Sequence, residues 1–413
     1  MNRVAITGVG VISPVGNSVE TFWNALTSGE CGIGPITKFD TTDYKVKLAA
    51  EVKDFDCTAF GIDKGAARRL DLFAQYALAA AQQAMDDSGI AGTVAPERLG
   101  VYVGSGIGGM ATFTQETEKL ITRGPNRVSP LFIPMMIGNM ASGNIAIKYN
   151  AKGPCLPVVT ACATSTHAVG EAFHAIKYGL ADAIIAGGAE ATILPLAVAG
   201  FSNLKALSTS TDPDCASLPF DARRAGFVMG EGAGILVLEN YDHAVARGAK
   251  IYAEVAGYGN TCDAHHITAP DPEAEGGASA IRIAVAEAGG CENQTVYVNA
   301  HGTGTPLNDS SETLAIKKAF GEQFAHEHVM VSSTKSMTGH MLGAAGAVEA
   351  VFTALTLRDG FLPATIHYRT ADPECDLDVV PNTGRAADVK YALSNSLGFG
   401  GHNGSLLFRK WEV

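Results

Sequence analysis

Residues 153–177, GPCLPVVTACATSTHAVGEAFHAIK, place a cysteine between two runs of opposite structural preference. The run 156–160 predicts a strand, in which Pro157 indicates an edge or a bulge, and the alanine-rich run that follows predicts a helix. Cys162 is therefore expected where a strand turns sharply into a helix, among small neighbours that leave its sulfur accessible. The N-terminal dipole and free N–H groups of that helix would lower the pKa of the thiol and favour a nucleophilic thiolate. A buried structural cysteine is the alternative.

The composition of the chain indicates a compact α/β protein and argues against a nucleic-acid-binding or membrane-spanning one. The chain has 413 residues, of which 46% are hydrophobic and 17% charged, and this is typical of a compact α/β protein large enough for two domains. The net charge of −12 argues against nucleic-acid binding. No membrane span is expected, because no apolar run is long enough, and no signal sequence precedes the first strand. Eight scattered cysteines without a CxxC pair indicate free thiols and a cytoplasmic location.

The order of elements predicts two halves. Strands alternate with helices along the chain, which indicates βαβ units and mainly parallel sheets. A first half is expected over residues 1–250, including a long amphipathic helix at 64–88, and a second over residues 251–413. Each half contains a strand, a glycine-rich turn and a helix of small residues, around Cys162 in one and Gly343 in the other. The halves are therefore expected to be similar.

Two histidines in the second half occupy settings like that of Cys162. His301 lies in NAHGTGTPLND and His340 in SSTKSMTGHMLGAAGA, which also contains Lys335. Both follow predicted strands, at the edge where open α/β sheets usually bind ligands. An isolated histidine is more often structural, but two at equivalent places beside a thiol favour a shared site. A thiol with two imidazoles can transfer acyl groups, because the sulfur takes the acyl group while the imidazoles polarise a carbonyl or move protons.

Four motifs resemble those of the β-ketoacyl-acyl-carrier-protein synthases, which belong to the thiolase-like superfamily. They are TACATS at 160–165, NAHGTGTPLND at 299–309, KSMTGHMLGAAGAVEA at 335–350 and NSLGFGGHNGS at 395–405. The similarity extends from VAITGVGVISPVG at residue 4 to the last strand. The resemblance implies a homodimer with a thiolase-like α/β fold. In this fold two similar βαβ halves with packed central sheets form five α-β-α-β-α layers.

The resemblance also implies a reaction, the decarboxylating Claisen condensation that elongates fatty acids by two carbons. Cys162 would hold an acyl group as a thioester. A malonyl group on acyl carrier protein would then lose CO2 and attack that thioester, giving 3-oxoacyl-carrier protein. Substrates would arrive on the phosphopantetheine of this acidic partner, and the enzyme itself would bind no cofactor and no metal. His301 and His340 would assist decarboxylation and hold the enolate oxygen. The backbone N–H groups of Cys162 and Phe399 would form the oxyanion hole, with Phe399 as a gate.

Further residues take roles from the same resemblance. Lys335 is similar to the family's active-site lysine and would be catalytic. Glu349 would be its partner, and Asp309 and Glu312 would fix the charge near the histidines. The alternative for these four is a buried ion network with no chemical role. The expected substrate contacts are Thr303 and Thr305 on the phosphopantetheine, Ile107 in the acyl pocket, His266 at its mouth, and Gly398 and Gly400 where backbone must approach the ligand closely. Ile107 favours a type II over a type I synthase.

Carrier-protein docking requires a basic patch on an acidic chain. Lys64, Arg68 and Arg69 have the spacing of one helical face, and Arg123, Arg127 and Lys205 are further candidates. An ordinary solvated face is the alternative.

Other interpretations remain. Gly104-x-Gly106-x-x-Gly109 formally fits a dinucleotide fingerprint, but its position favours pocket packing, so a nucleotide-dependent oxidoreductase is a distant rival. A metal site at residues 262–266 is disfavoured, because the ligands crowd onto one loop. The nearer rivals are a polyketide ketosynthase, a type I component and a non-catalytic chain-length partner, which would lack Cys162. His402 departs from the family, which more commonly has threonine there.

Overall fold

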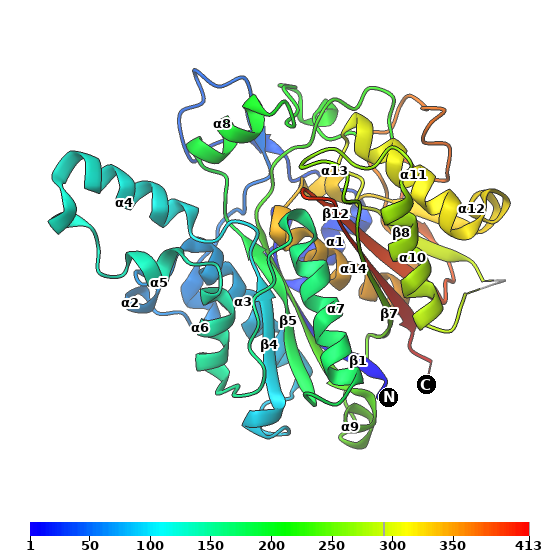
Figure 1. The fold of residues 1–413 in the computed structure, drawn as a ribbon, viewed down its shortest axis with the longest axis horizontal. Helices are drawn as coiled ribbons and strands as arrows, with labels where there is room; N and C mark the ends of the chain where they lie inside the picture. Colours follow the sequence, from blue (N-terminus) through cyan, green and yellow to red (C-terminus); the bar gives the residue numbers. More distant parts are fainter. Residues whose placement is uncertain (292–293, 413) are drawn as a thin grey trace.

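The computed structural model describes residues 1–291 and 294–412, and its centre is a nine-stranded mixed sheet (Figure 1). The strand order is β4-β5-β6-β1-β7-β13-β12-β8-β9. The first four strands along the sheet come from the first half of the chain: β1 (Val4–Ile12), β4 (Leu99–Gly104), β5 (Ala183–Glu190) and β6 (Gly232–Asn240). The other five are β7 (Ala253–Cys262), β8 (Val296–Asn299), β9 (Val329–Ser332), β12 (Tyr391–Gly398) and β13 (His402–Lys410).

The two half sheets meet at one corner. Strand β1 pairs with β7 only where Val4, Ala5 and Ile6 face Val255, Glu254 and Ala253. Beyond this short pairing the half sheets separate and enclose a helical layer. The remaining strands form two small ribbons: β2 (Gly34–Pro35) with β3 (Leu48–Ala49), and β10 (Phe361–Leu362) with β11 (Arg385–Ala386).

The helices complete the layers. Helices α7 (Thr164–Lys177) and α14 (Ala345–Asp359) lie between the half sheets, since each contacts strands of both. Helices α3 (Leu72–Ser88) and α6 (Met140–Tyr149) cover the outer face of the first half, and α10 (Glu275–Glu287) and α11 (Pro306–Phe320) cover the second. The predicted five-layered α/β fold is therefore confirmed.

The other helices lie around these layers, and α4 and α5 extend from the body at the left of Figure 1. They are α1 (Val19–Ser28), α2 (Lys64–Ala67), α4 (Met110–Arg123), α5 (Phe132–Met136), α8 (Pro195–Asn203), α9 (Tyr241–Ala246), α12 (Glu322–His328) and α13 (Lys335–Thr338).

Small residues allow the two central helices to approach closely. The residues of α14 from Ala345 to Leu357 are all buried, as expected for a helix that is apolar on every side. A Cβ built on Gly346 would lie 2.0 Å from Thr166 Oγ1, so only glycine fits this contact with α7. The N–H of Ala347 donates to Ser165 Oγ at 2.8 Å. These contacts bring the N-terminal ends of α7 and α14 together.

Three local predictions were wrong. The sheet is mixed, because among the described strands of the large sheet only β4–β5, β8–β9 and β8–β12 are parallel. The short turn between β12 and β13 forces that pair to be antiparallel. Residues 156–160 do not form a strand: Cys155 makes a single bridge to Val101, and Pro157 has no N–H with which to extend it.

The predicted helix over residues 64–88 is also interrupted. It consists of α2 and α3, separated by residues 68–71. Asp71 precedes α3, and its Oδ2 accepts hydrogen bonds from the N–H (2.9 Å) and the hydroxyl (2.6 Å) of Thr112 in α4. At the break, Asp71 therefore makes a contact with a segment some forty residues away in the sequence.

Candidate active site

Cys162 lies in a tight turn at the N-terminal end of α7. The turn, Ala161–Ala163, is a single 3₁₀ turn. Ala161 has a φ of +51°, a left-handed conformation that costs energy for a residue with a Cβ and must be held by its surroundings. Thr164 holds the turn from the helix side, since its hydroxyl accepts a hydrogen bond from Thr160 N at 2.9 Å. The cysteine is thus where the sequence predicted it, although a bridge and a turn replace the expected strand.

The thiol is less acidic than the sequence predicted. Burial raises the pKa of Cys162 to about 12. The charge of Lys335 and the backbone N–H groups of Phe399 and Cys162 lower this pKa, while Glu190 raises it, and burial outweighs them. The expected low pKa was therefore wrong. Cys162 is a protonated thiol at neutral pH, so its proton must leave as the sulfur reacts.

The two predicted histidines lie together. His301 follows β8 and His340 follows α13, and their rings are 5.2 Å apart and nearly perpendicular, at 88°. The ring of Phe227 lies 5.2 Å from that of His340. The His301 backbone N–H donates to Glu312 at 2.7 Å, and the His340 N–H donates to Val228 O at 2.7 Å. Hydrogen bonds of the backbone N–H groups therefore fix the positions of both histidines, and their rings lie next to each other.

Both imidazoles are neutral. Burial lowers the pKa of His301 and of His340 well below the usual value, and the positive charge of Lys335 lowers both further. Nδ1 of His301 and both ring nitrogens of His340 have no hydrogen-bond partner among the described residues. Buried polar atoms are normally paired. These nitrogens are therefore available to a ligand.

The predicted charged residues form a buried network behind the histidines. Lys335 is 1% exposed and makes an ion pair with Glu349, whose pKa burial raises. Burial also raises the pKa of Glu312 to about 7, and this carboxylate accepts from the N–H groups of both His301 and Gly302. Asp309, whose pKa is raised by burial, accepts from Gly304 N at 3.2 Å. The carboxylates thus fix the turn that carries His301.

A cavity of about 400 Å³ opens beside the nucleophile. Its lining includes eight of the residues predicted from the sequence: Cys162, His301, His340, Phe399, Thr303, Thr305, Gly398 and Lys205. Sequence analysis missed Phe201, Phe227, Asp263, Asn308 and Asn403, which also line it. Asn403 follows GFGGH directly, so the motif contained a signal for it. Phe201 and Phe227 lie on segments that only the fold brings to the cavity.

Three predicted substrate contacts lie outside the lining of this cavity. Ile107 is 43% exposed on the surface of the chain. His266 is exposed, and its Nδ1 accepts from Thr268 N and Ala269 N, both at 3.1 Å, so it stabilises its own loop. Gly400 belongs to the turn after Phe399 and donates to Ile267 O of that loop at 2.8 Å. This contact joins the two loops beside the cavity.

Glycines let the turn with Phe399 approach the nucleophile. A Cβ built on Gly398 would lie 2.8 Å from Thr160 O and 3.4 Å from Cys162 N. Gly400 has a φ of +90°, which disfavours any other residue. A Cβ at this position would also lie 3.2 Å from the ring of His402, so this ring lies directly against the turn.

Comparison with known proteins identifies the family. The model of the beta-ketoacyl synthase N-terminal domain matches residues 1–244, and that of the C-terminal domain matches residues 252–369. The chain belongs to the β-ketoacyl synthase family. The predicted enzyme class, a condensing acyltransferase, is thereby confirmed. Among the described residues of this synthase, no helix combines the length and apolarity needed to cross a membrane.

Relatives of the synthase cover it from end to end. It is 53% identical to 3-oxoacyl-[acyl-carrier-protein] synthase 2 of Staphylococcus aureus (strain COL), over 100% of this chain and 99% of that protein. Identity to the synthase 2 of Synechocystis sp. is 50%, over 99% and 98% of the two chains.

Solved structures agree with this assignment. The ishigamide ketosynthase/chain length factor superposes with a TM-score of 0.92 at 37% identity, over 100% of both chains. A type II polyketide ketosynthase in complex with its acyl-carrier protein superposes at 0.89 and 34% identity, again over 100% of both chains.

The six basic residues predicted to bind the carrier protein are exposed, and none makes an ion pair with a described residue. The geometric argument for three of them was wrong. Lys64 lies in α2, whereas Arg68 and Arg69 lie in the break before α3, so they do not share one helical face. Lys205 lines the cavity itself.

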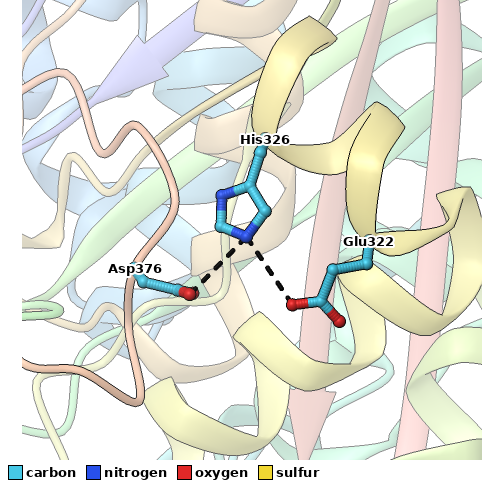
Figure 2. Close-up of side chains that lie close together, drawn as sticks. All are labelled: Glu322, His326 and Asp376. Carbon is cyan, nitrogen blue, oxygen red and sulfur yellow. Dashed lines mark ion pairs between the residues drawn. The ribbon is translucent and has the colours of Figure 1, made fainter.

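One cluster of possible metal ligands occurs among the described residues, far from the motifs of the synthase. Glu322 and His326 of α12 face Asp376 (Figure 2), with His326 Nε2 3.7 Å from Glu322 Oε1 and 3.5 Å from Asp376 Oδ2. All three are exposed. The Nζ of Lys317 lies 2.5 Å from Asp376 and 3.4 Å from Glu322, so an ammonium group already offsets part of the negative charge of these carboxylates. The cluster is an exposed ion-pair network.

Proposed function

We propose that this synthase elongates fatty acyl groups as a type II 3-oxoacyl-acyl-carrier-protein synthase, with Cys162, His301 and His340 as its catalytic residues. One observation carries the proposal: the thiol of Cys162 and two neutral imidazoles whose ring nitrogens lack hydrogen-bond partners line the same cavity. The 53% identity to synthase 2 of S. aureus, against 34% for a type II polyketide ketosynthase, favours fatty acid over polyketide synthesis.

In the first half reaction, the acyl group moves to Cys162. The sulfur attacks the thioester carbonyl of acyl-carrier protein, a new C–S bond forms, and the bond to the phosphopantetheine sulfur breaks. The proton of Cys162 leaves with that sulfur, so charge balances. The backbone N–H groups of Cys162 and Phe399 both lower the pKa of the thiol, and we assign to them the developing oxyanion.

In the second half reaction, malonyl-carrier protein loses CO2. The electrons of the broken C–C bond form an enolate, whose oxygen accepts hydrogen bonds from His301 and His340. Neutral imidazoles suit this role, because each has an N–H to donate and neither must first lose a proton. The enolate carbon then attacks the Cys162 thioester, and the cysteine sulfur leaves as a thiolate that takes up a proton.

The substrates reach the cavity on the phosphopantetheine of the carrier protein. Thr303 and Thr305, whose hydroxyl groups are 3.0 Å apart on the cavity wall, are suited to hydrogen-bond this arm. Lys205 at the cavity, with the other unpaired basic residues, provides positive charge for an acidic carrier. We propose no further cofactor. Eight scattered cysteines without a CxxC pair support a location in the reducing cytoplasm.

A homodimer is also part of the proposal. Strand β4 lies at one edge of the nine-stranded sheet, and the segment beside it exposes Leu156 (48%) and Val159 (61%). Phe113 and Ile133, at 44% and 54% exposure in the projecting α4–α5 region, add apolar surface nearby in the chain. An exposed sheet edge with apolar side chains is usually covered by a partner.

Intact-protein mass spectrometry tests the function. The synthase is mixed with acyl-carrier proteins of several chain lengths, in parallel with Cys162→Ala. We expect an acyl adduct on the wild type only, which malonyl-carrier protein discharges as a 3-oxoacyl product two carbons longer. Absence of any adduct would overturn the proposal and favour a non-catalytic chain-length partner. Repeated extension without release of a C2-elongated product would favour a polyketide ketosynthase.

A further inference from the structure

A buried histidine in the helix that follows Cys162 has no part in the mechanism above. His167 lies in α7, five residues after the nucleophile, and is 2% exposed. Its Nδ1 lies 2.7 Å from Thr160 Oγ1, and its Nε2 lies 3.3 Å from Asn403 O. Thr160 belongs to the first half of the chain and Asn403 to the second. One imidazole ring therefore joins the two halves beside the nucleophile.

The two contacts determine which ring nitrogen carries the proton. A carbonyl oxygen only accepts hydrogen bonds, so Nε2 of His167 is protonated and donates to Asn403 O. Burial lowers the pKa of His167 to about 4, so the ring is neutral at pH 7 and has this proton alone. Nδ1 therefore accepts a hydrogen bond from the Thr160 hydroxyl. Because both nitrogens are paired and the ring lies outside the described lining of the cavity, His167 is not a base for the thiol.

The two partners of His167 flank the segments that carry the N–H groups assigned to the oxyanion. Thr160 directly precedes the 3₁₀ turn of Cys162, and Asn403 follows the turn of Phe399. These turns come from opposite halves of the chain, so the spacing between their N–H groups depends on contacts between the segments. The hydrogen bonds of His167 supply such a contact.

The segments also touch each other around the His167 ring. A Cβ built on Gly404 would lie 3.0 Å from His167 Nε2, and one built on Gly398 would lie 2.8 Å from Thr160 O. Glycine at both positions permits this close packing, and the packing prevents the segments from moving closer together. The two hydrogen bonds of the imidazole oppose their separation. The ring thus limits movement of the two segments in both directions.

We propose that His167 is a positioning residue that fixes the spacing of the two oxyanion-hole N–H groups, those of Cys162 and Phe399. The inference rests on the proposed function, in which these groups hold the oxyanion when Cys162 is acylated and again when the enolate attacks the thioester. Decarboxylation instead places its negative charge on an oxygen bonded to His301 and His340. A misplaced oxyanion hole therefore slows acylation and condensation and leaves decarboxylation almost unchanged.

The test compares His167→Phe with wild type. Phenylalanine keeps a ring of similar shape and removes both hydrogen bonds. Intact mass measures acylation of Cys162 by acyl-carrier protein, and CO2 release from malonyl-carrier protein is measured on unacylated enzyme. We expect acylation to slow by about 10–100-fold, as for a misplacement of about 1 Å at a reacting centre, while CO2 release stays near the wild-type rate. Equal losses in the two rates, or unchanged acylation, would overturn the proposal.

His174→Phe is the matched control. His174 lies seven residues further along the same helix, and the rings of His167 and His174 both pack on Tyr258, with centroids 6.1 and 5.2 Å from its ring. Its Nε2 pairs with Glu287 at the end of α10 instead of with either turn. This variant should keep the wild-type ratio of acylation to CO2 release.

Thr160→Val tests the same hydrogen bond from its other end, because valine has the shape of threonine without the hydroxyl. If the two residues act through one bond, the double variant should acylate no more slowly than His167→Phe alone. Losses that multiply would overturn the proposal. If His167→Phe does not fold, Thr160→Val alone must lower the ratio of acylation to CO2 release, and an unchanged ratio would refute the role. Wild-type enzyme without any adduct would refute the proposed function instead.

Discussion

At the scale of single residues, Cys162 combines an accessible sulfur with a pKa that burial raises to about 12. Only the thiolate reacts with an alkylating agent, and its fraction falls tenfold for each pH unit below the pKa. We therefore expect iodoacetamide to modify Cys162 about tenfold faster per pH unit from pH 7 to 10, without a plateau. Fragmentation of the tryptic peptide 153–177, which contains both cysteines, locates the label and measures the rate at Cys162, with exposed Cys155 as the internal control. A plateau below pH 8 would contradict the buried-thiol assignment.

The histidines lead to a second prediction. Removing one hydrogen-bond donor to a developing oxyanion typically slows a reaction by about 10²–10³-fold. We expect His301→Ala and His340→Ala each to reduce malonyl-carrier decarboxylation by that factor, while acylation of Cys162 falls much less. Release of CO2 and the acyl adduct are measured separately.

The same reaction has a predicted pH dependence. The folded-state pKa of each histidine is lowered well below the usual value, so both stay neutral as the pH falls from 8 to 6. The wild-type decarboxylation rate should therefore not decline over this range through histidine protonation. A titration centred near pH 6.5 that disappears in His340→Ala would refute this.

The sequence predicted the site residues better than their surroundings. Cys162, His301 and His340 could be placed together because each follows a strand predicted from the sequence, and open α/β sheets usually bind ligands where strands end. The direction of the Cys162 pKa shift could not be predicted, because it depends on how deeply the folded chain buries the thiol. The exposure of Ile107 could not be predicted either, because it follows from tertiary packing.

At the scale of elements, the predicted alternation of strands and helices is present in both halves, since the apolar patterns of the core elements are long. The predicted helix at 64–88 failed where a local pattern competes with a distant contact. Asp71 is a residue type favoured at a helix N-terminus rather than inside a helix, and its carboxylate binds Thr112 where α3 begins. The prediction of mainly parallel sheets failed for a similar reason at β6 and β13, which pair antiparallel with their neighbours. The order of strands in a sheet cannot be predicted from a local sequence pattern.

Glu287 joins three elements and gives an element-scale prediction. At the end of α10, it accepts hydrogen bonds from His174 (2.9 Å) and Lys177 (2.7 Å) of α7 and from Tyr258 N (2.9 Å) of β7. Burial opposes its ionisation, but these bonds outweigh burial and lower its pKa to about 2. Because the folded pKa lies below the unfolded one, the stabilisation is present above about pH 4.5 and is lost as the pH falls toward 2.

We therefore expect Glu287→Gln to reduce the free energy of unfolding by about 2–3 kcal/mol at pH 7. The difference from wild type should shrink at pH 3.5. Urea denaturation at both pH values measures it, with Glu275→Gln, an exposed residue at the start of α10, as the control. An equal difference at the two pH values would show that the carboxylate charge is not responsible.

At the scale of the whole molecule, the proposed homodimer can be tested at the sheet edge. Val159→Glu would place an unpaired carboxylate in the interface, which costs more than about 1.4 kcal/mol and should weaken the dimer at least tenfold. Val245, 49% exposed on α9, lies on another element, and Val245→Glu should remain dimeric. Light scattering over a dilution series distinguishes them. Equal masses for both variants and wild type would exclude this edge.

The two halves share one core, so residues 1–250 and 251–413 should not unfold separately. A single core cluster contains Val169 and Leu236 of the first half and Val255 and Leu406 of the second. The chain has two tryptophans, one in each half, Trp23 and Trp411. Trp411 packs on Tyr241 of the first half, with ring centroids 5.4 Å apart.

We expect Trp23→Phe and Trp411→Phe, each with one remaining tryptophan, to show urea transitions with the same midpoint. Circular dichroism of each variant should follow the same curve, because separating the halves would expose the faces of α7 and α14 that pack against the other half. Coincidence of the three signals would establish one cooperative unit. Two midpoints, or a stable folded product from residues 1–250 expressed alone, would instead show that each half has an independent core. The contact between Thr166 and Gly346 would then be an interface rather than part of the interior.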